Sequence, residues 1–147
     1  MKSRLVLALI LGLAMMSAGA GSSAPTIVSP AQVHWMPGTG TLAGMQMAVL
    51  FGSPAKSGPF TIRIKVPDGL KMASHFHAGT ERVTVISGTF LAGVGDTMDA
   101  TKMMTFGPGT FIVMPANVHH YASVKGETVV QVEGMGPMSM VMVKAKK

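Results

Sequence analysis

The segment SHFHAGTE, residues 74–81, carries three side chains that can bind a metal ion. His75 and His77 are two residues apart, and on a β-strand such residues point to the same face, about 6.6 Å apart along the chain. Gly79 allows the chain to turn, so Glu81 can return toward the histidines on a partner strand. Imidazole nitrogens bind metals at about 2.1 Å, and a carboxylate beside them suits Mn, Fe, Ni, Cu or Zn without selecting one. The alternative is a pair of surface histidines without a ligand.

A second pair of histidines, His119 and His120, lies further along the chain in the sequence ANVHH. Successive residues of a strand face opposite sides of a sheet, so only one of the two can point toward a shared site. The alternation itself does not decide which one. The remaining histidine, His34, lies far away in VHWMPG and fits a surface or packing position.

Most of the chain consists of short apolar or alternating runs separated by glycine and proline. The clearest is PFTIRIKVP, whose period-two pattern puts Phe60, Ile62, Ile64 and Val66 on one face, as in a half-buried strand. Strands are predicted at residues 45–51, 60–66, 71–77, 81–86, 89–94, 110–114, 118–124, 127–133 and 138–143. A tight turn is expected at Lys125-Gly126, and residues 95–101 are expected to form a loop or one helical turn. Many short strands without a long amphipathic helix predict an all-β fold, a small antiparallel β-barrel or jelly roll.

The first 20 residues have the pattern of a cleavable signal peptide. Lys2 and Arg4 precede an apolar run at residues 5–16, and Ala18-Gly19-Ala20 is typical of a cleavage site. That run is too short to span a bilayer as a helix. We therefore expect a periplasmic or secreted protein, cleaved near Ala20 and without a stable membrane anchor afterwards; a retained interfacial anchor is the alternative.

Three parts follow from this division of the chain. Residues 1–20 are the signal peptide, residues 21–40 an irregular lead-in rich in serine and proline, and residues 41–147 one β-barrel domain.

Composition and charge exclude several kinds of site and partner. The chain has no cysteine, which excludes disulfides, thiolate ligands and thiol nucleophiles. Loss of Lys2 and Arg4 leaves ten of the 12 basic residues against six acidic ones, a net charge of +4. Basic residues cluster only at Lys144, Lys146 and Lys147, which suits a solvated tail. We therefore expect no nucleic-acid partner.

Two segments match the sequence motifs of the cupin superfamily. The first motif, G-x5-H-x-H-x3-E-x6-G, is matched at every position by Gly69, His75, His77, Glu81 and Gly88. GTFIVMPANVHH resembles the second motif, G-x5-P-x-G-x2-H-x3-N, in which His120 falls at the ligand position. Asn117 replaces the glycine of that motif, and asparagine tolerates a left-handed turn; Val124 replaces its asparagine. Over about residues 40–143 the chain is similar to cupins, in particular to short exported bacterial single-domain cupins and to the zinc-binding cupin modules of some anti-sigma factors.

This resemblance implies a metal inside a small antiparallel barrel. It implies one divalent transition metal (Fe, Mn, Ni, Cu or Zn) held by His75, His77, Glu81 and His120, and so selects His120 over His119. Cupins include dioxygenases, isomerases, decarboxylases and hydrolases, so the expected function is that of a metal-dependent enzyme, an oxygenase or isomerase, on a small organic substrate. The alternatives are a non-catalytic periplasmic protein that binds a metal or small ligand, and a sensory module, which the signal peptide disfavours.

Other residues bear on the site or on assembly. Gln131 and Tyr121 are candidates for polar groups behind the ligands, or ordinary residues of a strand. A methionine array follows at alternate positions: Met138, Met140 and Met142, preceded by Met135. Thioethers favour Cu(I), which raises copper handling as an alternative, although such side chains also fill cores and contacts between subunits. Barrels with exposed strand edges commonly pair, so one expectation is a homodimer.

Overall fold

The computed structural model describes residues 24–144, so the predicted signal peptide lies outside the described residues. Nine strands and three short 3-10 helices make up this part of the chain. The strands are β1 (Met36–Pro37), β2 (Gln46–Phe51), β3 (Gly58–Val66), β4 (Lys71–Phe76), β5 (Glu81–Val94), β6 (Met104–Phe106), β7 (Phe111–Met114), β8 (His120–Gly136) and β9 (Val141–Met142). The 3-10 helices are η1 (Pro30–Gln32), η2 (Gly40–Leu42) and η3 (Ala100–Lys102). The all-β prediction is confirmed. Within residues 24–144, none of the helices is long and apolar enough to cross a membrane.

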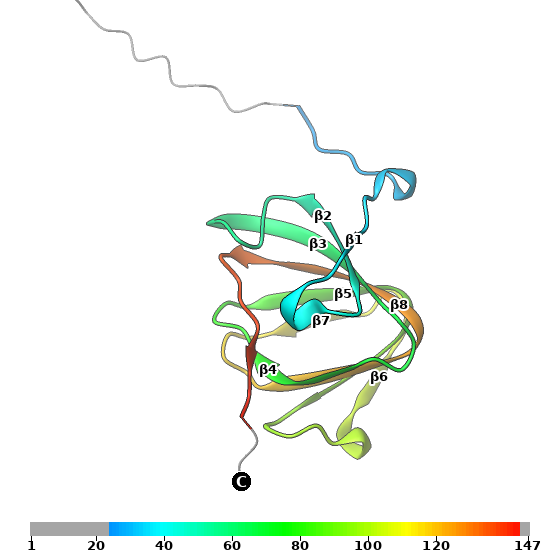
Figure 1. Cartoon of the computed structure of the whole chain (residues 1–147), viewed down its shortest axis with the longest axis vertical. Helices are drawn as coiled ribbons and strands as arrows, with labels where there is room; N and C mark the ends of the chain where they lie inside the picture. The colour runs from blue at the N-terminus through cyan, green and yellow to red at the C-terminus, as the bar shows by residue number, and fades with distance from the viewer. Residues whose placement is uncertain (1–23, 145–147) are drawn as a thin grey trace, which may run out of the picture.

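The two longest strands, β5 and β8, pair antiparallel along almost their whole length and organise the barrel (Figure 1). The second half of β8 also pairs with β3, which continues through β2 to β1, while the first half of β8 pairs with β4, which pairs with β9. On its other edge β5 pairs with β7 near its start and with β6 near its end. Each long strand therefore contributes to both sides of the barrel.

Both long strands bend at a glycine, which allows the barrel to close. Gly88 in β5 has φ +81° and Gly126 in β8 has φ +76°, a region that favours glycine. The β5–β8 register shifts between Val85 and Thr89. The fully buried Thr128 bridges the bend, because its hydroxyl accepts a hydrogen bond from the Thr89 amide at 3.1 Å and lies 3.2 Å from the Thr89 carbonyl oxygen.

The interior of the barrel is apolar. In β3 the residues Phe60, Ile62, Ile64 and Val66 are buried in alternation, as their sequence pattern predicts. They pack with residues of the long strands, among them Val83, Val85, Phe90, Val124, Val130 and Val132. The predicted turn residue Gly69 also has a positive φ, +73°.

The structure corrects several of the predicted elements. The tight turn at Lys125-Gly126 is wrong, because β8 continues through these residues and only bends there. The predicted strands at 81–86 and 89–94 are one strand, β5. The short strands β1 and β6 were not predicted, and β9 covers only part of the predicted strand at 138–143. Each error concerns a glycine that bends a strand or a segment of two or three residues, where periodicity is too short to detect.

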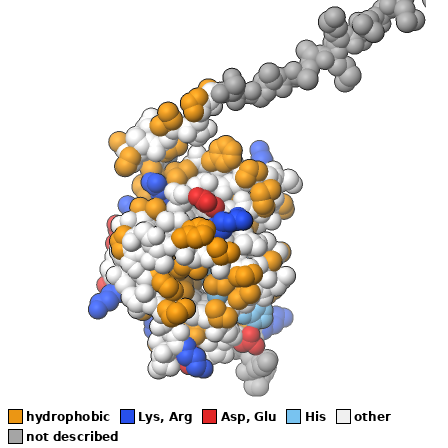
Figure 2. Space-filling model, turned by 180° about the vertical axis from the view of Figure 1, so that it is seen from behind, with side chains coloured by type: hydrophobic (Ala, Val, Ile, Leu, Met, Phe, Trp, Pro, Cys, Tyr) orange, Lys and Arg blue, Asp and Glu red, His pale blue; other side chains and the backbone are white. Residues whose placement is uncertain are grey.

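Large apolar side chains are exposed on the outer surface, including Phe51, Phe111, Val113 and Met104. Figure 2 shows apolar side chains spread over one face of the barrel around a few charged groups. Phe111 and Val113 lie on β7, which pairs only with β5 within the described residues. This open edge agrees with the features that led to the expectation of a homodimer, which stays a prediction.

We predict that Gly88→Ala destabilises the fold by about 2–4 kcal/mol, because alanine disfavours a positive φ and its Cβ would overlap Thr128 and Glu127. Gly107→Ala is the matched control, since a Cβ there meets no atom within 4 Å. The free energy of unfolding, measured by chemical denaturation, should fall for Gly88→Ala alone. Equal values for the two variants would contradict the role given to the bend.

Candidate metal centre

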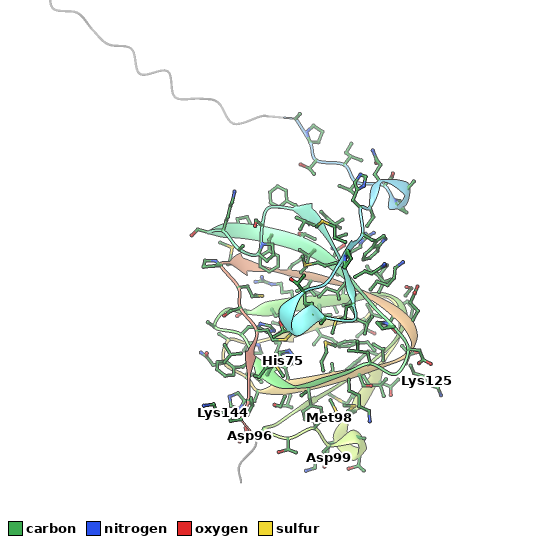
Figure 3. All side chains as sticks on the ribbon, in the orientation of Figure 1. His75, Asp96, Met98, Asp99, Lys125 and Lys144 are labelled. Carbon is green, nitrogen blue, oxygen red and sulfur yellow. The ribbon has the colours of Figure 1, made fainter. Side chains whose placement is uncertain are left out.

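Three histidines and one glutamate meet inside one end of the barrel, although they come from different strands. His75 is in β4, His77 directly follows it, Glu81 begins β5 and His120 begins β8. His75 and His120 are cross-strand partners in the β4–β8 ladder. Figure 3 shows His75 inside the barrel near the C-terminal segment, with Lys125 at the far end. Cross-strand partners share a face, so barrel closure and strand alternation bring the four side chains together.

The three histidines form a buried cluster with the spacing of a metal site. Their exposed fractions are 3% for His75, 6% for His77 and 5% for His120. One ring nitrogen from each lies within 4.8 Å of the others, and the ring centroids are 4.3–5.5 Å apart. Glu81 is close to two of them, with 3.6 Å from Oε1 to His77 Nε2 and 3.6 Å from Oε2 to His120 Nε2.

Backbone carbonyls orient all three rings. Nδ1 of His75, His77 and His120 donates to the carbonyl oxygens of Ala73 at 2.8 Å, Ser139 at 2.9 Å and Val118 at 2.9 Å. Because a carbonyl oxygen only accepts, Nδ1 carries the proton in each ring, and Nε2 of a neutral ring keeps a free lone pair. His77 Nε2 is buried and has no hydrogen-bond partner within residues 24–144.

These features fit a metal ion. A buried nitrogen without a partner is costly, and imidazoles whose other nitrogen is held by a carbonyl are typical of metal-binding histidines. With Glu81 the cluster offers three nitrogen donors and a carboxylate, a set that suits divalent transition metals. Metal binding by these four residues stays a prediction.

Burial and mutual interactions set the charges of the cluster. Burial lowers the pKa of His75 to about 4, and the nearby His120 and His77 add to this. Burial alone would raise the pKa of Glu81, but its interactions with His120 and His77 hold it below its ordinary value. Burial would lower the pKa of His120, but Glu81 and the Val118 carbonyl raise it. The cluster therefore keeps an ionised carboxylate and a neutral His75 near neutral pH.

The structure places His119 outside the cluster. Its ring stacks on Phe76 at 5.0 Å between centroids, and its Nδ1 lies 2.7 Å from Asp96 Oδ1. Its side chain is 36% exposed, and His34 is exposed as well. The turn before these residues is made by Asn117, which adopts φ +63° where the motif has glycine. Its amide donates to the His77 carbonyl oxygen at 2.8 Å, which ties this turn to the cluster.

Three cavities reach the cluster. The inner cavity, of about 50 Å³, is lined by His75, Glu81 and His120 and otherwise by apolar core residues. The β2–β3 cavity, of about 240 Å³, is lined by His77 and Glu81 at one side and by Phe60 and Met47 among others. The β4 cavity, of about 380 Å³, reaches His75 and has Lys71 on its wall. Mostly apolar walls suit a small organic molecule, and the β4 cavity has the volume of a small-molecule site.

Two roles were open for Gln131 and Tyr121, and one group that contacts the cluster has no signal in the sequence. Gln131 and Tyr121 line none of these three cavities: Gln131 bonds to Arg63 and Glu133, and the Tyr121 hydroxyl donates to the Asp99 carbonyl oxygen. The carbonyl of Ser139 was not predicted, because no sequence signal identifies a backbone acceptor.

An all-β barrel with these inward-facing histidines defines a protein of the cupin superfamily. The sequence model of the ChrR cupin-like domain family matches residues 23–139, and the chain belongs to this family. The matched range begins within the segment predicted as an irregular lead-in. No curated protein matches the chain.

Solved structures with similar folds include enzymes. A proposed acetylacetone dioxygenase from Methylibium petroleiphilum PM1 is 22% identical, with a TM-score of 0.63, over 83% of this chain and 84% of that one. The polyketide cyclase RemF from Streptomyces resistomycificus is 17% identical, with a TM-score of 0.63, over 84% and 89%. KdgF from Halomonas sp. is 16% identical, with a TM-score of 0.59, over 77% and 96%. At these identities the likeness shows the fold alone.

We predict that His75 of the metal-free protein titrates near pH 4 in an NMR pH titration, because burial opposes its protonation. The unfolded chain then binds a proton at this residue below about pH 6.5 that the folded chain does not. Stability from this group should therefore fall as the pH drops from about 6.5 to 4. A midpoint at or above pH 6 for His75 would contradict the buried, neutral state described here.

Proposed function

We propose that the protein holds one divalent transition metal between His75, His77, His120 and Glu81 and acts as a metal-dependent enzyme on a small organic substrate. The observation that carries this proposal is the geometry of the three imidazoles, each with Nδ1 bonded to a carbonyl and Nε2 directed into the cluster. A bound metal of this kind polarises a substrate oxygen or lowers the pKa of a bound water.

The residues around the cluster suit catalysis on a modest, partly apolar substrate. Glu81 supplies the one negative charge among the four donors, so an ion held there keeps a net positive charge. The apolar walls of the inner and β2–β3 cavities would exclude water and hold the apolar part of a substrate. An oxygenase or an isomerase is the class of enzyme that we propose. The names of RemF and of the proposed acetylacetone dioxygenase support an enzymatic role for this fold.

One observation favours a non-catalytic alternative, a protein that binds a metal or small ligand. Among the described residues that line the three cavities, the ionisable side chains are those of the cluster and Lys71. Apart from Lys71, the described residues that line these cavities therefore offer no general acid or base outside the cluster. Turnover distinguishes the two functions.

The adjacent histidines provide a matched test of the metal centre. The full-length chain is exported and purified from the periplasm, since the metal acquired in the cytoplasm can differ, and its metal is measured by mass spectrometry. We expect about one equivalent of metal per chain in the wild type and in His119→Ala, and loss of most of this metal in His120→Ala. Of these two adjacent histidines, His120 is the one that faces the cluster.

The same samples separate the enzyme from the binding protein. Turnover of a small dicarbonyl or other panel compound by the wild type and His119→Ala, but not by His120→Ala, supports the enzyme. Stoichiometric metal with no turnover across the panel supports the non-catalytic alternative. A folded wild type that refuses all added divalent ions, or full metal in His120→Ala, rules out the proposed ligand set.

We also propose that the protein works outside the cytoplasm, in the periplasm or after secretion. This is supported by the basic residues, apolar run and small residues at positions 2–20. The expected product of expression is an exported chain whose N-terminus, read by mass spectrometry, lies near Gly21. Leu9→Arg, which interrupts the apolar run, should leave the chain uncleaved in the cytoplasm. An uncleaved cytoplasmic wild type would contradict this location.

A further inference from the structure

A methionine of the C-terminal segment lies directly opposite one of the clustered histidines. Strands β4 and β9 pair antiparallel with His75 opposite Met142 and Phe76 opposite Val141. Met140 directly precedes β9 and so lies next to this paired segment. Opposed residues share a face, with Cβ atoms about 4.5–5.5 Å apart in a regular ladder.

A hydrogen bond confirms that this segment runs beside His77. His77 Nδ1 donates to the Ser139 carbonyl oxygen at 2.9 Å, although the two residues are 62 positions apart in sequence. The segment is also fixed at both ends, because the Met138 amide donates to the Pro54 carbonyl at 2.8 Å and the Val143 amide donates to the Ser74 carbonyl at 2.9 Å. Met140 is therefore held at the cluster by its neighbours on both sides.

Met140 lines the same cavities as the four clustered residues. Among the described residues, Met140 is the one that lines the inner, β2–β3 and β4 cavities alike. Between them, these three cavities reach His75, His77, Glu81 and His120. A half-buried side chain common to all three lies at their junction, next to the cluster rather than in the core.

The other methionines of the predicted array do not share this position. Met138 packs against the apolar core, and its Cε occupies the space that a Cβ on Gly134 would need. Met135 is 59% exposed and Met142 is 45% exposed. The four side chains therefore do not form one surface, and only Met140 combines partial burial with a place at the junction of the three cavities.

We propose that the Met140 thioether is a further donor to the metal of this cluster and gives the site a preference for copper in its Cu(I) state. The inference rests on the proposed metal centre and extends the ions that it holds to monovalent copper, which it names as the preferred one. Imidazole and carboxylate donors accept several divalent ions, whereas a thioether is a soft donor that selects Cu(I) and adds little to Zn(II) binding.

The experiment compares affinities for Cu(I) and Zn(II) in the mature full-length protein and in two matched variants. Met140→Leu keeps the volume of the side chain and removes the sulfur, a change that costs less than about 1.5 kcal/mol in a core. Met138→Leu makes the same change away from the cavity junction. Affinities are measured by competition with a chromogenic chelator, under anaerobic reducing conditions for Cu(I), and thermal unfolding checks that the variants are folded.

We expect Met140→Leu to weaken Cu(I) binding by roughly tenfold or more, the scale expected for loss of one useful donor, and to leave Zn(II) within about twofold. Met138→Leu should match the wild type for both ions. X-ray absorption of the Cu(I) form should show a sulfur neighbour in the wild type and in Met138→Leu, and none in Met140→Leu.

Two results would overturn the inference, and they can be told apart. If the wild type binds Zn(II) and Met140→Leu leaves the ratio of Cu(I) to Zn(II) affinity unchanged, the thioether is not a donor, while the proposed metal centre stands. If the folded wild type binds neither Cu(I) nor Zn(II), the role of Met140 fails, and the proposed metal centre fails with it when added Mn(II), Fe(II) and Ni(II) do not bind either.

Discussion

The antiparallel pairing of β5 with β8, together with the bends in both strands, is the constraint on which the rest of the structure depends. Along that ladder Arg82 pairs with Glu133 and Val94 with His120, so Glu81 and His120 lie near opposite ends. Their side chains nevertheless come within 3.6 Å. A straight ribbon would separate them by most of its length, since each residue adds about 3.3 Å. The carboxylate meets the imidazole only because the bends at Gly88 and Gly126 fold the two halves of the ladder over one another.

Closure of the barrel buries the charge of Glu81, and the histidines of the cluster pair with it. An ionised carboxylate inside an apolar barrel is costly unless it is paired. The interactions of Glu81 with His120 and His77 outweigh the effect of its own burial, while His75, with a pKa of about 4, stays uncharged. The backbone carbonyls of Ala73, Ser139 and Val118 fix which nitrogen of each ring carries the proton. The polar groups of the site are thus arranged before any ligand arrives, which is the condition for tight and selective binding.

The sequence predicts the fold class and most of the candidate site, but not how the parts connect. Alternation in PFTIRIKVP predicts β3 because one face of that strand is buried. The H-x-H-x3-E spacing predicts that the side chains of His75, His77 and Glu81 converge, because strand geometry and a single turn determine their positions locally. The turn predicted at Lys125-Gly126 is wrong, because a glycine with positive φ can form either a hairpin turn or a bend inside a long strand. The sequence pattern alone does not show whether Gln131 and Tyr121 support the ligands, since their hydrogen-bond partners, Arg63 and Asp99, are distant in sequence. The sequence does not distinguish Met140 from the other methionines of the array, because its position depends on the pairing of β9 with β4.

The hydrogen bonds to the three rings differ in how far along the chain their acceptors lie. His75 and His120 donate to carbonyls two residues earlier, in their own segments. These hydrogen bonds can therefore form as soon as those segments are extended. His77 relies on Ser139, from a segment made 62 residues later. Two rings can thus be oriented within short stretches of the chain, whereas the His77 ring is oriented only once the C-terminal segment has docked on β4.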